Sequence, residues 1–75
     1  MTSIDDQKFL RGLGERVRQA RIVQGWTQAE FAYKCGLHRT FIGSVERGER
    51  NISVLNLRQL AKVLRVGLGQ LVDGK

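Results

Sequence analysis

Hydrophobic residues recur at spacings of three and four along most of the chain, as in helices that bury one face. The first such stripe predicts a helix from Asp5 or Asp6 to Gln24, and Gly25 suits the left-handed residue that ends it. The stripe consists of Leu10, Leu13, Gly14, Val17, Ala20 and Arg21. The chain is therefore expected to begin with one long helix that turns a single face inward.

Two shorter helices are predicted next, with a glycine between them. Thr27 precedes Glu30 by the spacing of a capping box, so a helix is expected from Gln28 to just before Gly36. Its inward residues are Phe31, Ala32 and Cys35. After a tight turn, a third helix is expected over residues 38–46. Its inward residues are Phe41, Ile42 and Val45.

The remaining residues predict a loop, a fourth helix and a short fifth one. Residues 47–52 lack periodicity, and Ser53 then supplies an N-cap. The fourth stripe consists of Val54, Leu57, Leu60, Ala61 and Leu64. Gly67 and Gly69 interrupt the end of the chain, so a fifth helix has one or two turns and little stability of its own. We expect an all-α, compact five-helix fold and, at 75 residues, one domain over residues 1–75.

The charge balance favours a polyanionic partner. Lys and Arg number 13 against 7 for Asp and Glu, a net charge of +6. The single Cys35 excludes an intrachain disulfide framework and a multi-cysteine zinc site, which fits a reducing compartment. Because neither a signal peptide nor a membrane span is recognisable, we expect a cytoplasmic protein with no membrane role.

Candidate catalytic residues are scarce. One His, one Cys and scattered carboxylates form no pairing of nucleophile and base, and no glycine loop that could cradle a phosphate. We therefore expect no enzymatic activity, no cofactor and no metal. Cys35 is assigned to the core, and Trp26 and Tyr33 to packing at the core or its rim.

Two short helices joined by a glycine-centred turn, over about residues 28–46, form a helix-turn-helix arrangement. The outer face of the second helix is polar and partly basic, with Arg39 and Thr40 at its N-terminal end. A helix of this kind fits the major groove of DNA and presents its N-terminal side chains to base edges. The arrangement predicts binding of double-stranded DNA.

Residues 27–50 read TQAEFAYKCGLHRTFIGSVERGER, and a helix that reads LRQLAKVLRV follows. This pattern resembles the helix-turn-helix domains of phage repressors and Cro proteins, also called the xenobiotic-response-element family. The match covers about Leu13 to Leu71 and rests on the spacing of Gln28, Ala32, Gly36, Ile42, Glu46 and Gly48. Within the family, HRTFIGSVERGERNIS looks most like the controller proteins of restriction-modification systems.

The resemblance implies a repressor-type transcriptional regulator that binds a palindromic operator as a homodimer, with half-sites one helical turn apart. RNA polymerase is a further candidate partner. One alternative is an antitoxin-type autorepressor that also binds a toxin protein. Another is a module that uses the same surface to bind another protein.

The resemblance also assigns roles to particular residues. Those expected to contact bases are Arg39, Thr40, Ser44 and Arg50. Those expected to contact the DNA backbone are Thr27, Gln28, His38, Arg47 and Asn51. Arg21 and Glu46 match a largely buried ion pair between the first helix and the end of the third.

Two positions depart from the family pattern. His38 stands where the family usually has Ser, Thr or Asp as a helix cap, so it either leaves the helix start less stable or contacts a phosphate. Gly43 stands where controller proteins often have Ser, which removes a contact and lowers helix stability.

A self-complementary patch is expected to join two copies, because the chain has more hydrophobic residues than one small core can bury. The candidates lie at the fourth helix and in the last segment. They are Leu55, Val66, Leu68, Leu71 and Val72.

Overall fold

The computed structural model describes residues 3–74, and within them the chain forms five helices and no strand. The helices are α1 (Ile4–Gln24), α2 (Gln28–Cys35), α3 (Arg39–Glu46), α4 (Val54–Leu64) and α5 (Leu68–Asp73). The all-α class and the five-helix fold are confirmed. The prediction of one domain over residues 1–75 includes residues 1, 2 and 75, which lie outside the described residues.

The start of α1 differs slightly from its prediction. The Ser3 side chain accepts a hydrogen bond from the Asp6 backbone N–H, and the Asp6 carboxylate accepts one from the Ser3 N–H. This capping box places the first helical residue at Ile4, just before the predicted start at Asp5 or Asp6. The sequence contains the signal, because a serine lies three residues before an acidic one.

The other predicted caps are confirmed. Thr27 and Glu30 form the capping box of α2, and the Ser53 side chain accepts from a backbone N–H at the start of α4. The hydrogen bond from the Thr27 backbone N–H lowers the pKa of the exposed Glu30 carboxyl. His38 occupies the N-cap position of α3 without a side-chain hydrogen bond, as expected for an imidazole there.

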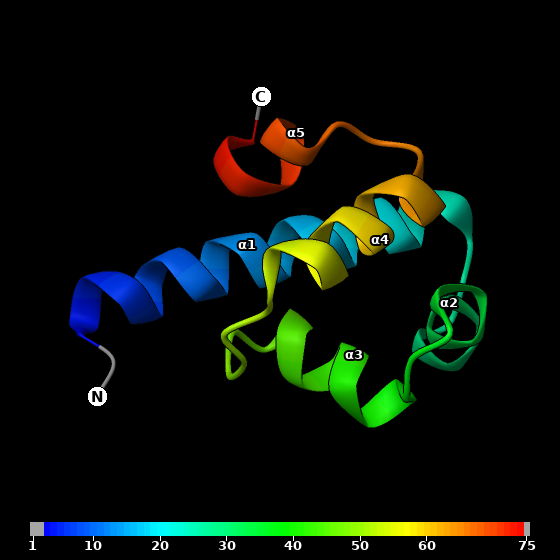
Figure 1. The fold of residues 1–75 in the computed structure, drawn as a ribbon, viewed down its shortest axis with the longest axis horizontal. Coiled ribbons are helices and arrows are strands. Elements are labelled where there is room, and N and C mark those ends of the chain that lie inside the picture. The colour runs from blue at the N-terminus through cyan, green and yellow to red at the C-terminus, as the bar shows by residue number, and fades with distance from the viewer. Residues whose placement is uncertain (1–2, 75) are drawn as a thin grey trace.

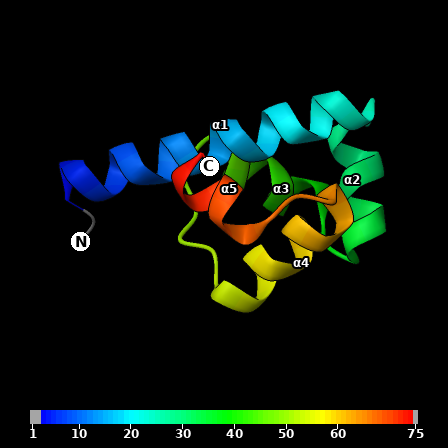
Figure 2. The same cartoon turned by 90° about the horizontal axis from the view of Figure 1, so that it is seen from above.

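The long helix α1 runs the length of the molecule, and its first turns extend past the other helices in both views (Figures 1 and 2). In Figure 1, α3 lies below α1 and α5 lies above it. The outer face of α3 and the surface formed by α5 are therefore on opposite sides of the molecule.

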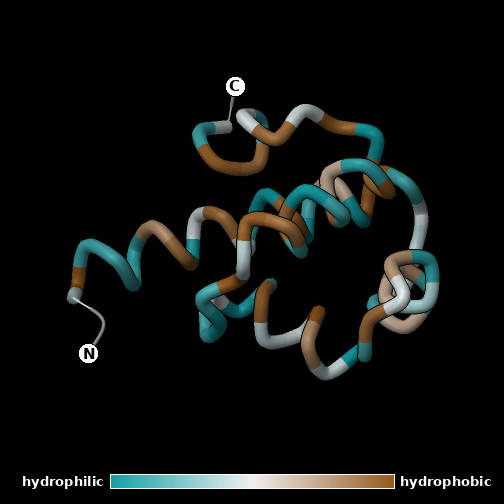
Figure 3. Tube along the Cα trace, viewed as in Figure 1, coloured by the Kyte–Doolittle hydropathy of each residue, from teal (hydrophilic) through white to brown (hydrophobic). Residues whose placement is uncertain are grey.

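All five helices contribute to one hydrophobic core, and the tube in Figure 3 shows hydrophobic positions spaced along each of them. The buried core residues are Leu13, Val17, Phe31, Ala32, Cys35, Ile42, Val45, Leu57, Leu60, Ala61, Leu64 and Leu71. The inward stripes predicted from periodicity supply most of this set. Burial of these side chains holds α3 against the rest of the protein.

Three predictions about hydrophobic residues are wrong. Val54, placed in the inward stripe of the fourth helix, is 70% exposed, because it is the first residue of α4 and the buried face of that helix begins a turn later, at Leu57. Leu71 is 1% exposed, so it belongs to the core and not to a surface patch, because α5 docks with this residue turned inward. Tyr33 is 87% exposed and packs neither in the core nor at its rim. The reason is that α2 turns Phe31, Ala32 and Cys35 inward, which leaves position 33 on the opposite side of the helix.

A side chain of α1 holds the short helix α5 in place. Arg16 Nε donates to the carbonyl oxygen of Leu71 at 2.6 Å, and Arg16 Nη2 donates to that of Val72 at 2.7 Å. These carbonyls belong to the end of a helix, where no partner within the helix is available. Arg16 therefore supplies a cap to a helix that its glycines leave weak.

Cys35 is expected to react slowly with thiol reagents. It is buried, and burial raises the pKa of its thiol to about 11 because the thiolate loses solvation. At pH 8 the thiolate fraction is then roughly a hundredfold below that of an exposed cysteine. Measuring the rate of Ellman's reaction in buffer and in urea tests this, with the rate expected to rise by that order on unfolding. Equal rates in the two conditions would show that the thiol is accessible in the folded protein.

Candidate nucleic-acid interface

The turn between α2 and α3 depends on Gly36. Its φ of +70° lies in the left-handed region, which a glycine adopts without strain. The backbone N–H groups of Gly36 and Leu37 both donate to the last turn of α2, the latter to the Ala32 carbonyl at 2.9 Å. The chain thus reverses within a few residues, and α2 and α3 form the predicted helix-turn-helix.

The first turn of α3 presents polar side chains to solvent. Arg39 and Thr40 are exposed, whereas Ile42 and Val45 on the other side of the helix are buried. A shallow hollow lies on this outer face. It is lined by Gln28, Arg39, Thr40, Gly43 and Arg47. Two of the four side chains expected to read bases, Arg39 and Thr40, are therefore free to enter a groove.

Ser44 and Arg50, the other two candidates for base contact, are linked to each other. The Ser44 hydroxyl donates to the Phe41 carbonyl oxygen at 2.7 Å and accepts from Arg50 Nε at 3.4 Å. The Arg50 guanidinium also lies 5.0 Å from the centroid of the Phe41 ring, within the range of a cation–π contact. These contacts bring Arg50 from the loop after α3 onto the surface of α3, a placement that the sequence did not reveal.

A hydrogen-bonded network fixes the far end of α3. Arg21 Nε donates to Glu46 Oε2 at 2.7 Å, and Arg21 Nη2 donates to Glu46 Oε1 at 3.0 Å. Arg21 Nη1 also donates to the Trp26 carbonyl at 2.7 Å. The Glu46 side chain is 2% exposed, and its hydrogen bonds raise the pKa of the Arg21 guanidinium. The pair thus joins α1, the α1–α2 turn and α3.

Gln28 is part of the same network. Its amide nitrogen donates to Glu46 Oε1 at 3.0 Å, which leaves the second amide N–H to reach a phosphate. The expected contact of Gln28 with the DNA backbone is therefore compatible with its position, and its bond to Glu46 also braces α3. The hydrogen bond to Glu46 spans 18 residues, so the sequence alone could not place it.

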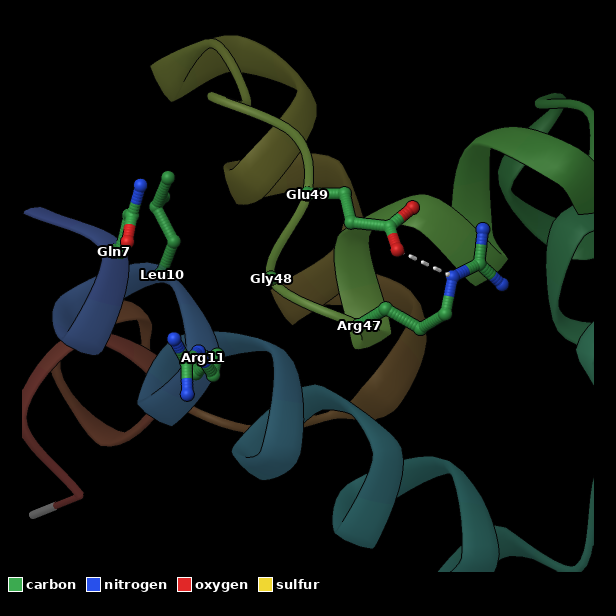
Figure 4. Close-up of a pocket in the computed structure, with 6 residues that line it drawn as sticks. All are labelled: Gln7, Leu10, Arg11, Arg47, Gly48 and Glu49. Atoms are coloured by element: carbon green, nitrogen blue, oxygen red, sulfur yellow. Dashed lines mark ion pairs between the residues drawn. The ribbon is translucent and has the colours of Figure 1, made fainter. Parts of the chain in front are cut away.

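The other candidates for backbone contact surround this face. Thr27, His38, Arg47 and Asn51 are all exposed. Arg47 Nε lies 3.1 Å from Glu49 Oε2, as Figure 4 shows beside the hollow between α1 and the loop after α3. An exposed pair of this kind contributes little stability, so Arg47 can exchange its carboxylate partner for a phosphate at small cost.

Within residues 3–74, no three His, Cys, Asp or Glu side chains gather as metal ligands would. In the same residues no helix combines the length and the apolar character that crossing a membrane requires.

Comparison with known proteins identifies the family. The helix-turn-helix family matches residues 17–71, most of the chain. The chain belongs to the helix-turn-helix family. The matched residues contain α2, α3 and the Arg21–Glu46 pair, whereas the projecting first turns of α1 lie outside them.

Among helix-turn-helix proteins, this one is similar to controllers of restriction-modification systems. Control protein C.BamHI of Bacillus amyloliquefaciens is 41% identical over 61 residues, which cover 80% of this chain and 75% of that protein. Control protein C.SmaI of Serratia marcescens is 45% identical over 60 residues, covering 80% and 71%. The crystal structure of the restriction-modification controller protein C.AhdI from Aeromonas hydrophila superposes with a TM-score of 0.84 at 37% identity, covering 89% and 97%. The resemblance to controller proteins is confirmed, and these relatives are regulators, not enzymes.

Proposed function

We propose that this helix-turn-helix protein is a sequence-specific DNA-binding regulator of transcription, a controller protein of a restriction-modification system. The observation that carries the proposal is the outer face of α3, where Arg39 and Thr40 are exposed on a helix that the core and the Glu46 network hold rigid. With α3 in the major groove, Arg39 would donate two hydrogen bonds to a guanine. Thr40, Ser44 and Arg50 read neighbouring base edges.

Phosphate contacts supply affinity and position in this proposal. Thr27 and Gln28 lie at the start of α2, His38 at the start of α3, and Arg47 and Asn51 in the loop after α3. The chain is cationic overall, so binding is expected to weaken steeply as salt rises. Cytoplasmic DNA is the target, and RNA polymerase at the occupied promoter is a further partner.

Replacing Arg39 with alanine tests base reading. We expect operator affinity to fall by roughly 5- to 150-fold while affinity for unrelated DNA changes little, because a bidentate contact to guanine contributes about 1–3 kcal/mol of discrimination. Sites selected from random DNA supply the operator, and fluorescence anisotropy at fixed salt measures both affinities. Arg18→Ala removes the same charge from an exposed position on α1 and is the control. If both variants lose affinity equally for every sequence, Arg39 does not read bases.

We further propose that two copies bind a palindromic operator through a patch that includes Leu55 and Leu68. Leu55 is 72% exposed and Leu68 is 39% exposed. Val66 and Val72 are partly buried and pack against the core, so they contribute only the edges of such a patch. A twofold arrangement would place the two copies of α3 in successive major grooves.

Replacing Leu68 with glutamate is expected to produce a monomer, because it sets like charges against each other in an apolar contact. Helicity should be unchanged, since Leu68 contributes only part of its surface to the fold. Sedimentation velocity measures the oligomeric state and circular dichroism the helicity. Tyr33→Glu introduces the same charge at an exposed position outside the patch and should leave the dimer intact. A Leu68→Glu protein that sediments as a dimer would place the interface elsewhere.

A further inference from the structure

A second hollow lies where the α1–α2 turn meets the C-terminal end of α4. We call it the Trp26 hollow. Its lining residues are Gln24, Trp26, Lys34, Lys62, Val63 and Arg65. Of these described side chains three are cationic and none is acidic. The hollow therefore combines a concentrated positive charge with a partly apolar floor.

We propose that the Trp26 hollow binds an acidic segment of a protein partner. Carboxylates of the segment would pair with Lys34, Lys62 and Arg65, and an adjacent apolar side chain would rest against Val63 and the edge of the Trp26 ring, without displacing Lys34 from its face. Within residues 3–74, none of these three cations forms an ion pair. Glu30, one turn before Lys34, accepts its hydrogen bond from Thr27 in the capping box and attracts Lys34 only through space, without an ion-pair contact. The positive charge of the hollow is thus available to an outside ligand.

The backbone at Arg65 supports a role for its side chain. Arg65 ends α4 with a φ of 60°, and among the described residues it is the only non-glycine with a positive φ. The helices α1, α2 and α5 end on glycines in the same left-handed conformation. Glycine adopts this conformation without strain, whereas a side chain with a Cβ atom does so at a cost in stability. Arg65 therefore brings a cation to the edge of the hollow, although the backbone conformation at this position favours glycine.

The geometry favours a peptide over nucleic acid. The Trp26 ring stacks with the buried Phe31 at a centroid distance of 6.1 Å, and the exposed Lys34 ammonium lies 4.9 Å from the ring centroid. An incoming nucleobase would have to displace Lys34 in order to stack. Figure 1 shows the C-terminal end of α4 toward the top of the molecule and α3 at the bottom. A duplex held by the outer face of α3 would therefore leave the hollow open.

Trp26 itself can report binding, because it is the only tryptophan in the sequence. The probe is a short synthetic peptide of alternating glutamate and leucine, titrated into the full chain without DNA. We expect a saturable change in tryptophan fluorescence that weakens with salt, because exposed charges are screened. A matched peptide with glutamine in place of glutamate should not bind. Absence of a saturable signal, or equal binding of both peptides, overturns the proposal.

Two variants then assign the binding to the hollow. Lys62→Gln and Arg65→Gly should each raise the Kd for the acidic peptide by roughly three- to tenfold. Lys8→Gln, the same charge change on the projecting end of α1, should leave the Kd unchanged. Arg65→Gly should also keep or raise the urea midpoint of unfolding, since it relieves the left-handed conformation. Loss of binding with retained stability would exclude misfolding as the cause.

The affinities of the hollow variants and of Lys8→Gln also show whether the peptide binds in the hollow. An unchanged Kd in both hollow variants, or an equal loss in Lys8→Gln, would mean that the peptide binds by general charge attraction and would overturn the proposal. If Lys62→Gln weakens operator DNA as much as it weakens the peptide, the hollow belongs to the DNA surface instead. Because the peptide is measured without DNA, a peptide that does not bind says nothing against the proposed operator binding. Conversely, an Arg39→Ala protein with unchanged operator affinity says nothing against peptide binding in the hollow.

Discussion

Replacing Gly14 with alanine is expected to destabilise the protein by at least about 3 kcal/mol. A Cβ atom at Gly14 would overlap the Val45 carbonyl oxygen and lie 2.7 Å from that of Glu46. Both oxygens belong to the backbone of α3 and cannot rotate away, so α1 and α3 would have to separate. Separation would loosen the packing of Val17 and Ile42 in the core.

Gly12 offers a matched control on the same helix. A Cβ atom there would lie 3.2 Å from Arg16 Nη1, which makes neither of the hydrogen bonds to α5, so this nitrogen can shift by a few tenths of an ångström while Nε and Nη2 keep their partners. Alanine also gains about 0.5–1 kcal/mol of helix propensity over glycine. Gly12→Ala should therefore remain within about 1 kcal/mol of the parent protein. Urea unfolding followed by circular dichroism measures both free energies, and near-equal values for the two variants would refute the close contact between α1 and α3.

The difference between Gly12 and Gly14 shows how far the sequence could predict the fold. Periodicity placed Gly14 on the inward stripe of α1, and caps such as Thr27 predicted where helices begin. Both signals are local, because they depend on neighbouring residues of one helix. That the backbone of α3 approaches Gly14 depends on the spacing between two helices. A glycine within an otherwise helical stripe was the only hint of it.

The candidate interface likewise has features that local sequence patterns predict and features that depend on contacts between distant residues. Exposure of Arg39 and Thr40 followed from the period of α3. The contact of Arg16 with the end of α5 spans 55 residues and left no trace in the local pattern. Leu71 is expected in a surface patch because the chain has more hydrophobic residues than one small core can bury, and a helix of six residues is too short for its periodicity to show that this side chain docks inward. Local patterns therefore predicted the elements and the exposed face of α3, and tertiary packing decided the rest.

Replacing Arg21 with methionine is expected to cost about 3–5 kcal/mol of stability, because it would leave the buried Glu46 carboxylate without its counter-charge. The variant keeps an unbranched apolar stem and removes the guanidinium, so the loss reports mainly on the charge and its hydrogen bonds. High salt should restore little of this stability, since counter-ions in solution compensate poorly for the buried Glu46 carboxylate. Operator affinity should also fall, because Glu46 is the group through which α1 and α2 hold the end of α3.

A double-variant cycle separates the pair from its surroundings. Glu46→Leu removes the charge that Arg21→Met leaves unpaired, so the double variant should be more stable than the sum of the two single losses predicts, by about 1–3 kcal/mol. Arg18→Met is the control, because Arg18 lies on the same helix and pairs with Glu15 at 3.5 Å in an exposed position. Its cost should be below about 1 kcal/mol. Urea unfolding of the parent protein, the two single variants, the double variant and Arg18→Met gives every free energy that the comparison needs. If Arg21→Met costs no more than Arg18→Met, α3 is held by hydrophobic contacts alone, and the network does not position the reading helix.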